Sequence, residues 1–214
     1  MTPYYGDGKG IVIYNGDCRD VLPTLGRFDL LLTDPPYGLG YDGHAQDFST
    51  RAHGARKGFD FDGWDGQVPD NLGQCMAAAD AHVIWGGNYF TSQLPGTRGW
   101  LVWDKGQSGL SQSDCELAYS SREGSLRRLV LNRVALLKDG TSHPTQKPVC
   151  LMRWCLSFFP DAETVLDCYM GSGTTLVAAK LEGRSATGIE ISEKYCEIAA
   201  NRLRQGVLDF GGDA

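Results

Sequence analysis

The chain has 214 residues, of which 42% are hydrophobic and 21% charged, as expected for one globular domain with a sizeable core. No apolar run approaches the ~20 residues that a membrane-spanning helix needs, and residues 1–7 lack the pattern of a secretory signal. We therefore expect a cytoplasmic protein that has no membrane partner. The net charge of −6 disfavours an overall basic surface, so any polyanion-binding face must come from local clusters.

The first half of the chain alternates short apolar runs with turn residues. We expect strands at 11–14, 28–33 and 81–85 and helices at 20–25 and 71–81. The run at 28–33 (FDLLLT) is continuously apolar, which is typical of a strand buried on both faces of a parallel sheet. Residues 86–90 (GGNYF) form either an ordinary turn or the border of a ligand site. Residues 39–69 have no period, which predicts a long functional loop.

The second half continues this alternation. We expect strands at 100–103, 116–120, 164–167 and 186–190, and helices at 148–159, 174–182 and 192–205, with Ser192 as an N-cap. The basic segment 124–140 is expected to be partly a hairpin. Strands that alternate with helices predict a single α/β domain over residues 1–214, with a doubly wound, mostly parallel, Rossmann-like sheet.

Seven cysteines are scattered along the chain, and no two of them form a Cys-x-x-Cys pair. An odd number without metal-ligand spacing predicts reduced thiols, with neither a disulfide framework nor a metal site.

A glycine-rich turn follows the expected strand at 164–167, which ends in Asp167. Gly171-Ser172-Gly173 would let the backbone approach a ligand closely, and a helix that begins at Thr174 would offer free amides. About twenty residues later a second strand ends in Glu190, whose carboxylate can accept hydrogen bonds from both hydroxyls of a ribose. The pattern predicts a nucleoside-containing cofactor. Taken alone, it leaves a nicotinamide cofactor open, although the glycine spacing is not G-x-G-x-x-G.

Asp34-Pro35-Pro36-Tyr37 follows the other buried strand, and its residue types suit chemistry on an aromatic amino group. The nitrogen of such a group is a poor nucleophile because its lone pair is delocalised into the ring. Asp34 can accept one amino hydrogen and the rigid carbonyl of Pro35 the other, which would free the lone pair. Tyr37 can stack on a base that has left the duplex. A plain Pro-Pro turn with Asp34 as a cap is the alternative.

Together these motifs resemble those of the DNA amino-methyltransferases, in the permuted (beta-class) subgroup whose catalytic loop precedes the cofactor loop. The order here is Asp34 to Tyr37, then 143–148 (HPTQKP), then 167–175. The resemblance implies a methyltransferase fold that depends on S-adenosylmethionine, and methyl transfer to N6 of adenine in DNA. It also places Thr145 and Lys147 at the methionine carboxylate of the cofactor.

The resemblance assigns further residues to the cofactor. It implies that Asp17 accepts from the amino group of the cofactor's adenine and that Cys18 supplies a backbone amide. One departure is Cys168-Tyr169, where the family often has Pro-Phe. The expected cofactor-binding residues are Asp17, Cys18, Asp34, Thr145, Lys147, Asp167, Tyr169, Gly171, Ser172, Gly173, Thr174, Glu190 and Ile191.

No large separate target-recognition domain is evident in the sequence. Base selection is therefore expected to fall to DNA-facing insertions at 39–69 and 106–138, or to the partner in a homodimer, which family members often form. The residues expected to bind DNA are Arg51, Arg56, Lys57, Arg122, Arg127 and Arg128.

Three alternatives stay open. Cytosine-N4 methylation uses the same fold, but its enzymes more often carry serine in place of Asp34. Methylation of RNA or of a protein glutamine is the second, and the glutamine enzymes usually carry asparagine there. The third is a catalytically silent DNA-binding or inhibitor protein on a methyltransferase scaffold, which the intact Asp34, Tyr37 and Glu190 disfavour.

Overall fold

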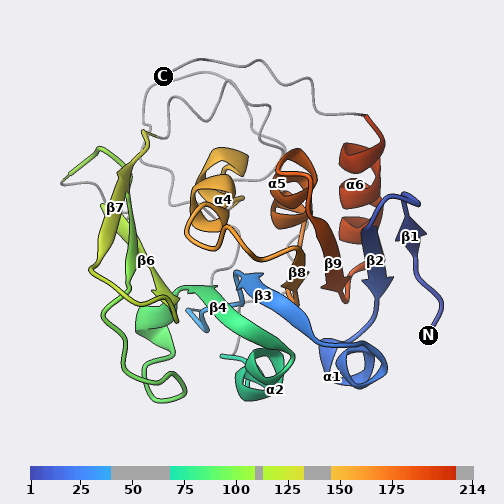
Figure 1. Cartoon of the computed structure of the whole chain (residues 1–214), viewed down its shortest axis with the longest axis horizontal. Coiled ribbons are helices and arrows are strands. Elements are labelled where there is room, and N and C mark those ends of the chain that lie inside the picture. Colours follow the sequence, from blue (N-terminus) through green and yellow to red (C-terminus); the bar gives the residue numbers. More distant parts are fainter. Residues whose placement is uncertain (40–67, 109–112, 133–145, 206–214) are drawn as a thin grey trace, which may run out of the picture.

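The computed structural model describes residues 1–39, 68–108, 113–132 and 146–205. Within these ranges it contains a nine-stranded sheet in the order β1-β2-β9-β8-β3-β4-β6-β5-β7 (Figure 1). The strands are β1 (Tyr5–Gly6), β2 (Ile11–Asn15), β3 (Phe28–Thr33), β4 (Ala79–Trp85), β5 (Leu101–Asp104), β6 (Cys115–Ser120), β7 (Arg127–Val130), β8 (Thr164–Asp167) and β9 (Ser185–Glu190). The helices are α1 (Cys18–Val21), α2 (Leu72–Ala77), α4 (Val149–Leu156), α5 (Thr174–Leu181) and α6 (Glu193–Arg204), with the short 3-10 helices η1 (Leu22–Thr24) and η2 (Gly87–Tyr89).

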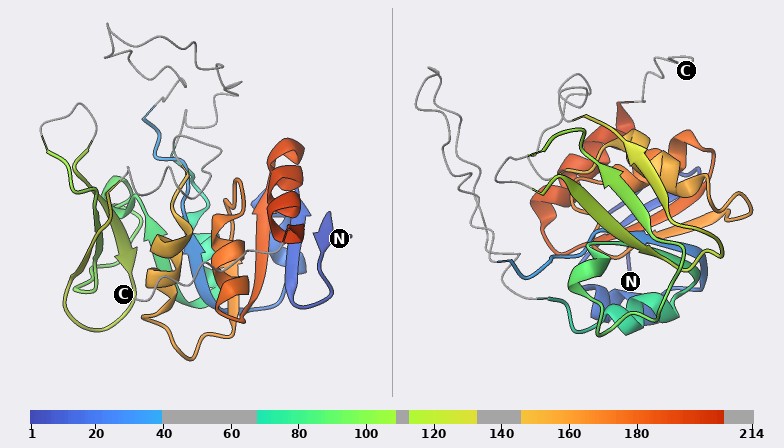
Figure 2. Two further views of the ribbon diagram at one scale, coloured as in Figure 1. Left: turned by 90° about the horizontal axis from the view of Figure 1, so that it is seen from above. Right: turned by 90° about the vertical axis from the view of Figure 1, so that its left-hand side faces the viewer.

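The sheet is mostly parallel, as predicted. Strands β2, β9, β8, β3 and β4 form a continuous parallel block, and β7 pairs in parallel with β5. β6 runs antiparallel to both of its neighbours, β4 and β5, and β1 is an antiparallel edge strand. In the left-hand view of Figure 2, β5 to β7 (green to yellow) gather at one end of the sheet and β1 (blue) lies at the other.

Helices cover both faces of the sheet, so the doubly wound α/β architecture is confirmed. α4, α5 and α6 lie on one face, and α1 and α2 lie on the other (Figure 1). Side chains of β3 alternate between the two cores, because successive residues of a strand point to opposite faces. Leu30 and Leu32 belong to the core under α4 to α6, whereas Leu31 packs with Val21 and Leu72. All three leucines of β3 are fully buried, as the apolar run predicts.

The strand order reverses between β8 and β3. β4 follows β3 along the chain and lies on one side of it, while β9 follows β8 and lies on the opposite side. In open α/β sheets, ligands bind beside such a switch point, at the carboxyl ends of the strands. Asp34 comes directly after β3 and Asp167 ends β8, so this edge is where a site is expected.

Some predicted boundaries and contacts are wrong. The helix expected at 71–81 ends at Ala77, and β4 already begins at Ala79. Ala79 pairs with Phe28 in the parallel ladder of β3 and β4, and this tertiary pairing overrides the helix preference of the alanines. The described part of 124–140 contains β7, which forms no hairpin there because it pairs with β5. Ser192 occupies the N-cap position of α6, but its side chain makes no capping hydrogen bond.

All seven cysteines lie in the described ranges, and none of them forms a disulfide bond there. None of the helices in the described ranges is both long and apolar enough to cross a membrane.

Candidate active site

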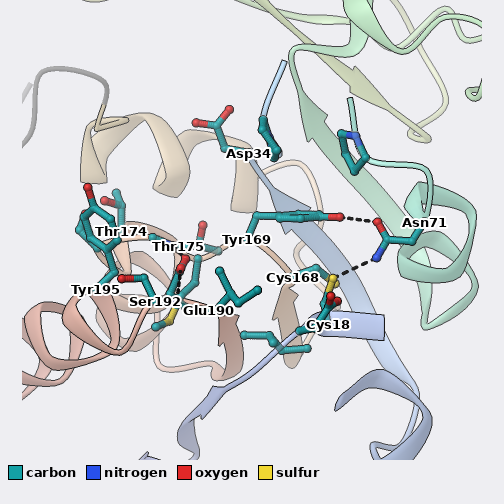
Figure 3. Close-up of a pocket in the computed structure, with 18 of the residues that line it drawn as sticks. Cys18, Asp34, Asn71, Cys168, Tyr169, Thr174, Thr175, Glu190, Ser192 and Tyr195 are labelled. Atoms are coloured by element: carbon teal, nitrogen blue, oxygen red, sulfur yellow. Dashed lines mark hydrogen bonds between the residues drawn. The ribbon is translucent and has the colours of Figure 1, made fainter. Parts of the chain in front are cut away.

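A pocket of about 1070 Å³ opens at the carboxyl ends of the parallel strands. This volume is at the upper end of the usual range for small-molecule sites. The residues that line it come from distant parts of the sequence, and Figure 3 shows Asp34 between Tyr195 on one side and Asn71 on the other. The lining includes most residues predicted to bind the cofactor: Asp17, Cys18, Asp34, Lys147, Tyr169, Gly171, Ser172, Thr174, Glu190 and Ile191.

The glycine turn after β8 and the acid at the end of β9 are held together. Gly171 and Gly173 have positive φ angles of 51° and 79°, which favour glycine. Glu190 accepts a hydrogen bond at Oε2 from the backbone N–H of Gly171 (3.0 Å) and at Oε1 from that of Ser192 (2.8 Å). Burial raises the pKa of Glu190 despite these bonds. Each carboxylate oxygen keeps a lone pair for a ligand hydroxyl, so the geometry suits a ribose.

Gly173 does not line the pocket. A Cβ at this position would come within 2.7 Å of the Cβ of Ala199. Glycine is therefore required for the approach of α6 to the start of α5. The predicted contact of Gly173 with the cofactor stays a prediction.

One wall of the pocket is built by α1, Asn71 and Tyr169. Asp17 is the N-cap of α1, and its carboxylate accepts from the backbone N–H of Arg19 (2.9 Å). Asn71 donates to the sulfur of Cys18 (3.0 Å), and its side-chain oxygen accepts from the Tyr169 hydroxyl (2.5 Å; Figure 3). These bonds fix the tyrosine ring on the wall. The sequence patterns do not indicate Asn71, because only the tertiary structure brings it to Tyr169.

Asp167 lies beneath the pocket and does not line it. Its Oδ1 accepts from the Thr33 hydroxyl (2.7 Å) and from the backbone N–H of Tyr169 (3.1 Å). Burial raises the pKa of Asp167 to about 6, although hydrogen bonds from Thr175 and Thr33 act in the opposite direction. The predicted contact of Asp167 with the cofactor stays a prediction. This residue shapes the turn that carries Tyr169.

The side chains of Asp34 and Tyr37 meet at the end of β3. The Tyr37 hydroxyl donates to Oδ1 of Asp34 at 2.6 Å. Its ring stacks on Tyr89 with centroids 5.0 Å apart and planes 19° from parallel. Gly86, with φ of +70°, leaves room for this ring, because a Cβ there would overlap it. Residues 86–90 thus border Tyr37. Of the two prolines, Pro36 lines the pocket and Pro35 is buried next to it.

Lys147 contacts Asp34 directly. Its ammonium lies 2.6 Å from Asp34 Oδ2 and 3.1 Å from the Tyr37 hydroxyl. It also lies 3.0 Å from Glu116 Oε2, and Glu116 Oε1 is 2.7 Å from the ammonium of Lys105. Lys147 thus lines the pocket and is ion-paired within the protein, and its predicted contact with the methionine carboxylate stays a prediction. Glu116 lies on β6, and Lys105 directly follows β5. Neither strand carries a sequence motif, so no sequence pattern indicates these two residues.

The basic residues predicted to bind DNA fall into separate groups. Arg127 and Arg128 lie on the outer strand β7, where Arg128 pairs with Asp104 at 3.3 Å. Arg122 lies over the ring of Phe158, with its guanidinium carbon 4.7 Å from the ring centroid. Phe158 borders the amino ends of β3 and β4, at the opposite edge of the sheet from Asp34, so Arg122 is not brought to the pocket. Arg51, Arg56, Lys57 and Thr145 lie outside the described residues.

Comparison with known proteins places the chain in a family. The model of the DNA methylase family (N6_N4_Mtase) matches residues 83–201, which is more than half of the chain. The type II methyltransferase M.ScaI of Streptomyces caespitosus is 25% identical over 94% of this chain and 83% of that protein. Relatives with 43% and 45% identity match over only 65 and 62 residues, about a quarter of their own length.

Solved structures show the same fold. The structure of the M1.HpyAVI–SAM complex has a TM-score of 0.61 and 22% identity, and covers 90% of this chain and all of that chain. The cytosine-N4-specific PvuII DNA methyltransferase has a TM-score of 0.58 and 14% identity, with 95% and 88% covered. With its family match and this fold, the chain belongs to the DNA methylase family.

Proposed function

We propose that this protein transfers a methyl group from S-adenosylmethionine to the exocyclic N6 amino group of adenine in DNA. The observation that carries the proposal is the position of Asp34. Its carboxylate lines the cofactor-sized pocket and is hydrogen-bonded to Tyr37, so a flipped base stacked on Tyr37 would present its amine to the pocket.

S-adenosylmethionine fits the chemistry of the pocket. Glu190 would bind the ribose hydroxyls, and Asp17 with the backbone of Cys18 would bind the adenine. Gly171 and Ser172 let the backbone approach closely beside the N-terminus of α5. When bound, this cofactor supplies an electrophilic methyl group on a sulfonium centre. The shared fold of the M1.HpyAVI–SAM complex supports the assignment.

The residues at the end of β3 would activate the target amine by hydrogen bonding. Asp34 would accept one amino hydrogen and the carbonyl of Pro35 the other, which directs the nitrogen lone pair out of the ring plane toward the pocket. As the nitrogen is methylated it gains positive charge, which the Asp34 carboxylate stabilises before accepting the surplus proton. Burial, aided by Asp34, holds the pKa of Tyr37 well above its usual value, so its ring stacks as a neutral phenol.

Adenine is favoured as the target because the motif begins with Asp34, whereas the resemblance implies serine more often in cytosine enzymes. Cytosine-N4 methylation is the second candidate, and the fold shared with the cytosine-N4-specific PvuII enzyme supports it. Nucleoside analysis of unmethylated DNA treated with the protein and S-adenosylmethionine distinguishes them. We expect N6-methyladenine. N4-methylcytosine would support the second candidate, and cofactor binding without any transfer would support a silent scaffold.

Replacement of Asp34 tests the catalytic role. Asp34→Ala should reduce methyl transfer by at least ~10²-fold, the typical effect of losing a group that stabilises developing charge. Cofactor affinity should stay within a few-fold, because Asp34 would touch the target amine and not the ribose or adenine of the cofactor. Asp80→Ala is a matched control, since Asp80 is exposed and, within the described residues, forms an ion pair with Arg27 alone. Transfer at the wild-type rate by Asp34→Ala would exclude the proposed mechanism.

A further inference from the structure

Two charged residues linked to Asp34 through Lys147 have no part in the proposed reaction: Lys105, which is buried, and Glu116, which is half-buried. Glu116 lies on β6, and Lys105 follows β5. The side chains of Lys105 and Lys147 are only 9% and 6% exposed. Burying an unpaired ammonium costs several kcal/mol, so these groups are tolerated only with their counter-charges in place.

The charged groups form a continuous chain that ends on Asp34. Lys105 contacts Glu116 Oε1, Glu116 Oε2 contacts Lys147, and Lys147 contacts Asp34 Oδ2, at 2.7, 3.0 and 2.6 Å. The rings of Tyr37 and Trp85 flank the Lys147 ammonium, with centroids 5.5 and 5.6 Å away. Two carboxylates and two ammonium groups balance in this chain. Loss of one member therefore leaves a buried charge uncompensated.

The two oxygens of Asp34 are held in different ways. Oδ2 accepts from a charged ammonium, whereas Oδ1 accepts from the neutral hydroxyl of Tyr37. Both bonds have an ionised acceptor, but only the contact with Lys147 adds the Coulombic attraction between two opposite full charges. An incoming amine would therefore displace the Tyr37 hydroxyl from Oδ1, while Lys147 continues to hold the carboxylate through Oδ2.

Glu116 supplies the second anchor of Lys147. Its Oε2 makes an ion pair with Lys147 without hydrogen-bond geometry, and is otherwise a buried oxygen without a hydrogen bond among the described residues. Glu116 draws the ammonium toward β6 and shares its charge. Without Glu116, two ammonium groups would face the single carboxylate of Asp34.

We propose that Glu116 is a positioning residue for methyl transfer, which acts through Lys147 to hold the Asp34 carboxylate and the Tyr37 hydroxyl where the target amine meets them. This inference rests on the proposed function. It does not place Glu116 in contact with the base or the cofactor.

The test compares Glu116→Gln with wild-type protein in single-turnover transfer of labelled methyl groups to DNA. We expect the rate to fall by at least ~10-fold, as misplacement of a reacting group commonly causes. Affinity for S-adenosylmethionine, measured by calorimetry, should stay within ~3-fold. If Glu116 acts through Lys147, its loss should add nothing once Lys147 is replaced, so Lys147→Met and the double variant should have equal rates.

Several outcomes would overturn the inference: a wild-type rate in Glu116→Gln, a parallel loss of cofactor affinity, or additive effects with Lys147→Met. Glu182→Gln is the matched control, because Glu182 forms an exposed ion pair with Arg153 away from the site. If Glu116→Gln does not fold, Glu116→Asp decides the matter. It keeps the charge but withdraws the carboxylate by one methylene, so a reduced rate with intact cofactor binding is expected and an unchanged rate overturns the inference.

Failure of the proposed function is distinguishable. If the wild-type protein methylates no DNA, that function fails, and a crystal structure of Glu116→Gln then decides the positioning role. Displaced Asp34 and Tyr37 side chains would support it, and side chains in their wild-type positions would overturn it.

Discussion

Glu190 has both carboxylate oxygens held by backbone amides, those of Gly171 and Ser192. The first amide belongs to the glycine turn and the second precedes α6. The side chain is thus fixed before a ligand binds, which reduces the entropy lost on binding. Asp167 is also an acid at a strand end, but its Oδ1 accepts hydrogen bonds from the Thr33 hydroxyl and the backbone N–H of Tyr169. Two residues with the same sequence signal therefore differ in their hydrogen-bond partners, and of the two only Glu190 lines the pocket.

The role of Glu190 is testable by its removal. Glu190→Ala should weaken S-adenosylmethionine binding by ~1.5–3 kcal/mol, the usual value for hydrogen bonds to a charged group, or roughly 10- to 100-fold in Kd. Isothermal calorimetry measures this directly. Glu182→Ala, at an exposed carboxylate, is the control. Unchanged cofactor affinity in Glu190→Ala would contradict a ribose contact.

At the scale of elements, the connection from β4 to η2 forms the back of the Tyr37 site. Gly86 adopts φ of +70°, and η2 then places Tyr89 against the Tyr37 ring. The turn thereby supports an aromatic side chain that comes from a different strand. This contact gives a reason for the turn at residues 86–90, which ends the buried strand β4.

Gly86→Ala should disturb that support. Its Cβ would overlap the Tyr37 ring in addition to the strain of positive φ. We expect methyl transfer to fall by ~10-fold or more while cofactor affinity stays near wild type, because Gly86 does not line the pocket. Gly183→Ala is a close control, since Gly183 also has φ of +70° but nothing within 4 Å of an added Cβ. Equal transfer rates in the two variants would refute the support role.

At the scale of the whole molecule, the charged chain joins β3, β5, β6 and the segment before α4. Burial alone would raise the pKa of Glu116, but Lys147 and Lys105 outweigh it and hold the pKa at about 2. Burial would likewise lower the pKa of Lys147, but Asp34, Tyr37 and Glu116 raise it well above its usual value. The ion pairs therefore connect the proposed catalytic loop, residues 34–37, to the distant half of the sheet.

This arrangement predicts a pH dependence of stability. Glu116 has a pKa lowered from 4.5 to about 2, so its contribution is present above pH 4.5 and is lost as the pH falls toward 2. The contribution is on the order of 3 kcal/mol. The difference in unfolding free energy between wild type and Glu116→Gln should thus be largest above pH 4.5 and shrink toward pH 2. Urea titrations at several pH values measure it, and a difference that is constant over this range would contradict the prediction.

Asp167 does not obscure this comparison. Burial raises its pKa to about 6, so its effect on stability changes as the pH passes between 3.8 and 6. Because the residue is present in both proteins, its contribution cancels in the difference.

The homodimer and the DNA-binding roles of Arg51, Arg56 and Lys57 stay predictions.

The sequence by itself determined the alternating strands and helices, the buried run of β3, and the edge at which Asp34, Gly171 and Glu190 meet. These features follow from local rules. Apolar periodicity and turn residues define the elements, and parallel strands bring their carboxyl ends to one edge. The chemistry of an acid followed by two prolines and a tyrosine also needs no tertiary information to be recognised.

Only the tertiary structure decided which charges are paired and which acids face the pocket. Lys105 directly follows β5 and Glu116 lies 11 residues later on the neighbouring strand β6, Lys147 lies 31 residues further along, and no local pattern indicates that they share one charged cluster. The hydrogen bond between Asn71 and Tyr169 is likewise a contact between distant residues that no local pattern indicates. Ala79, predicted to be helical, lies in β4 because it pairs with Phe28 of β3. Burial and partner identity depend on contacts between distant residues, and these contacts set both the pKa of a side chain and its role.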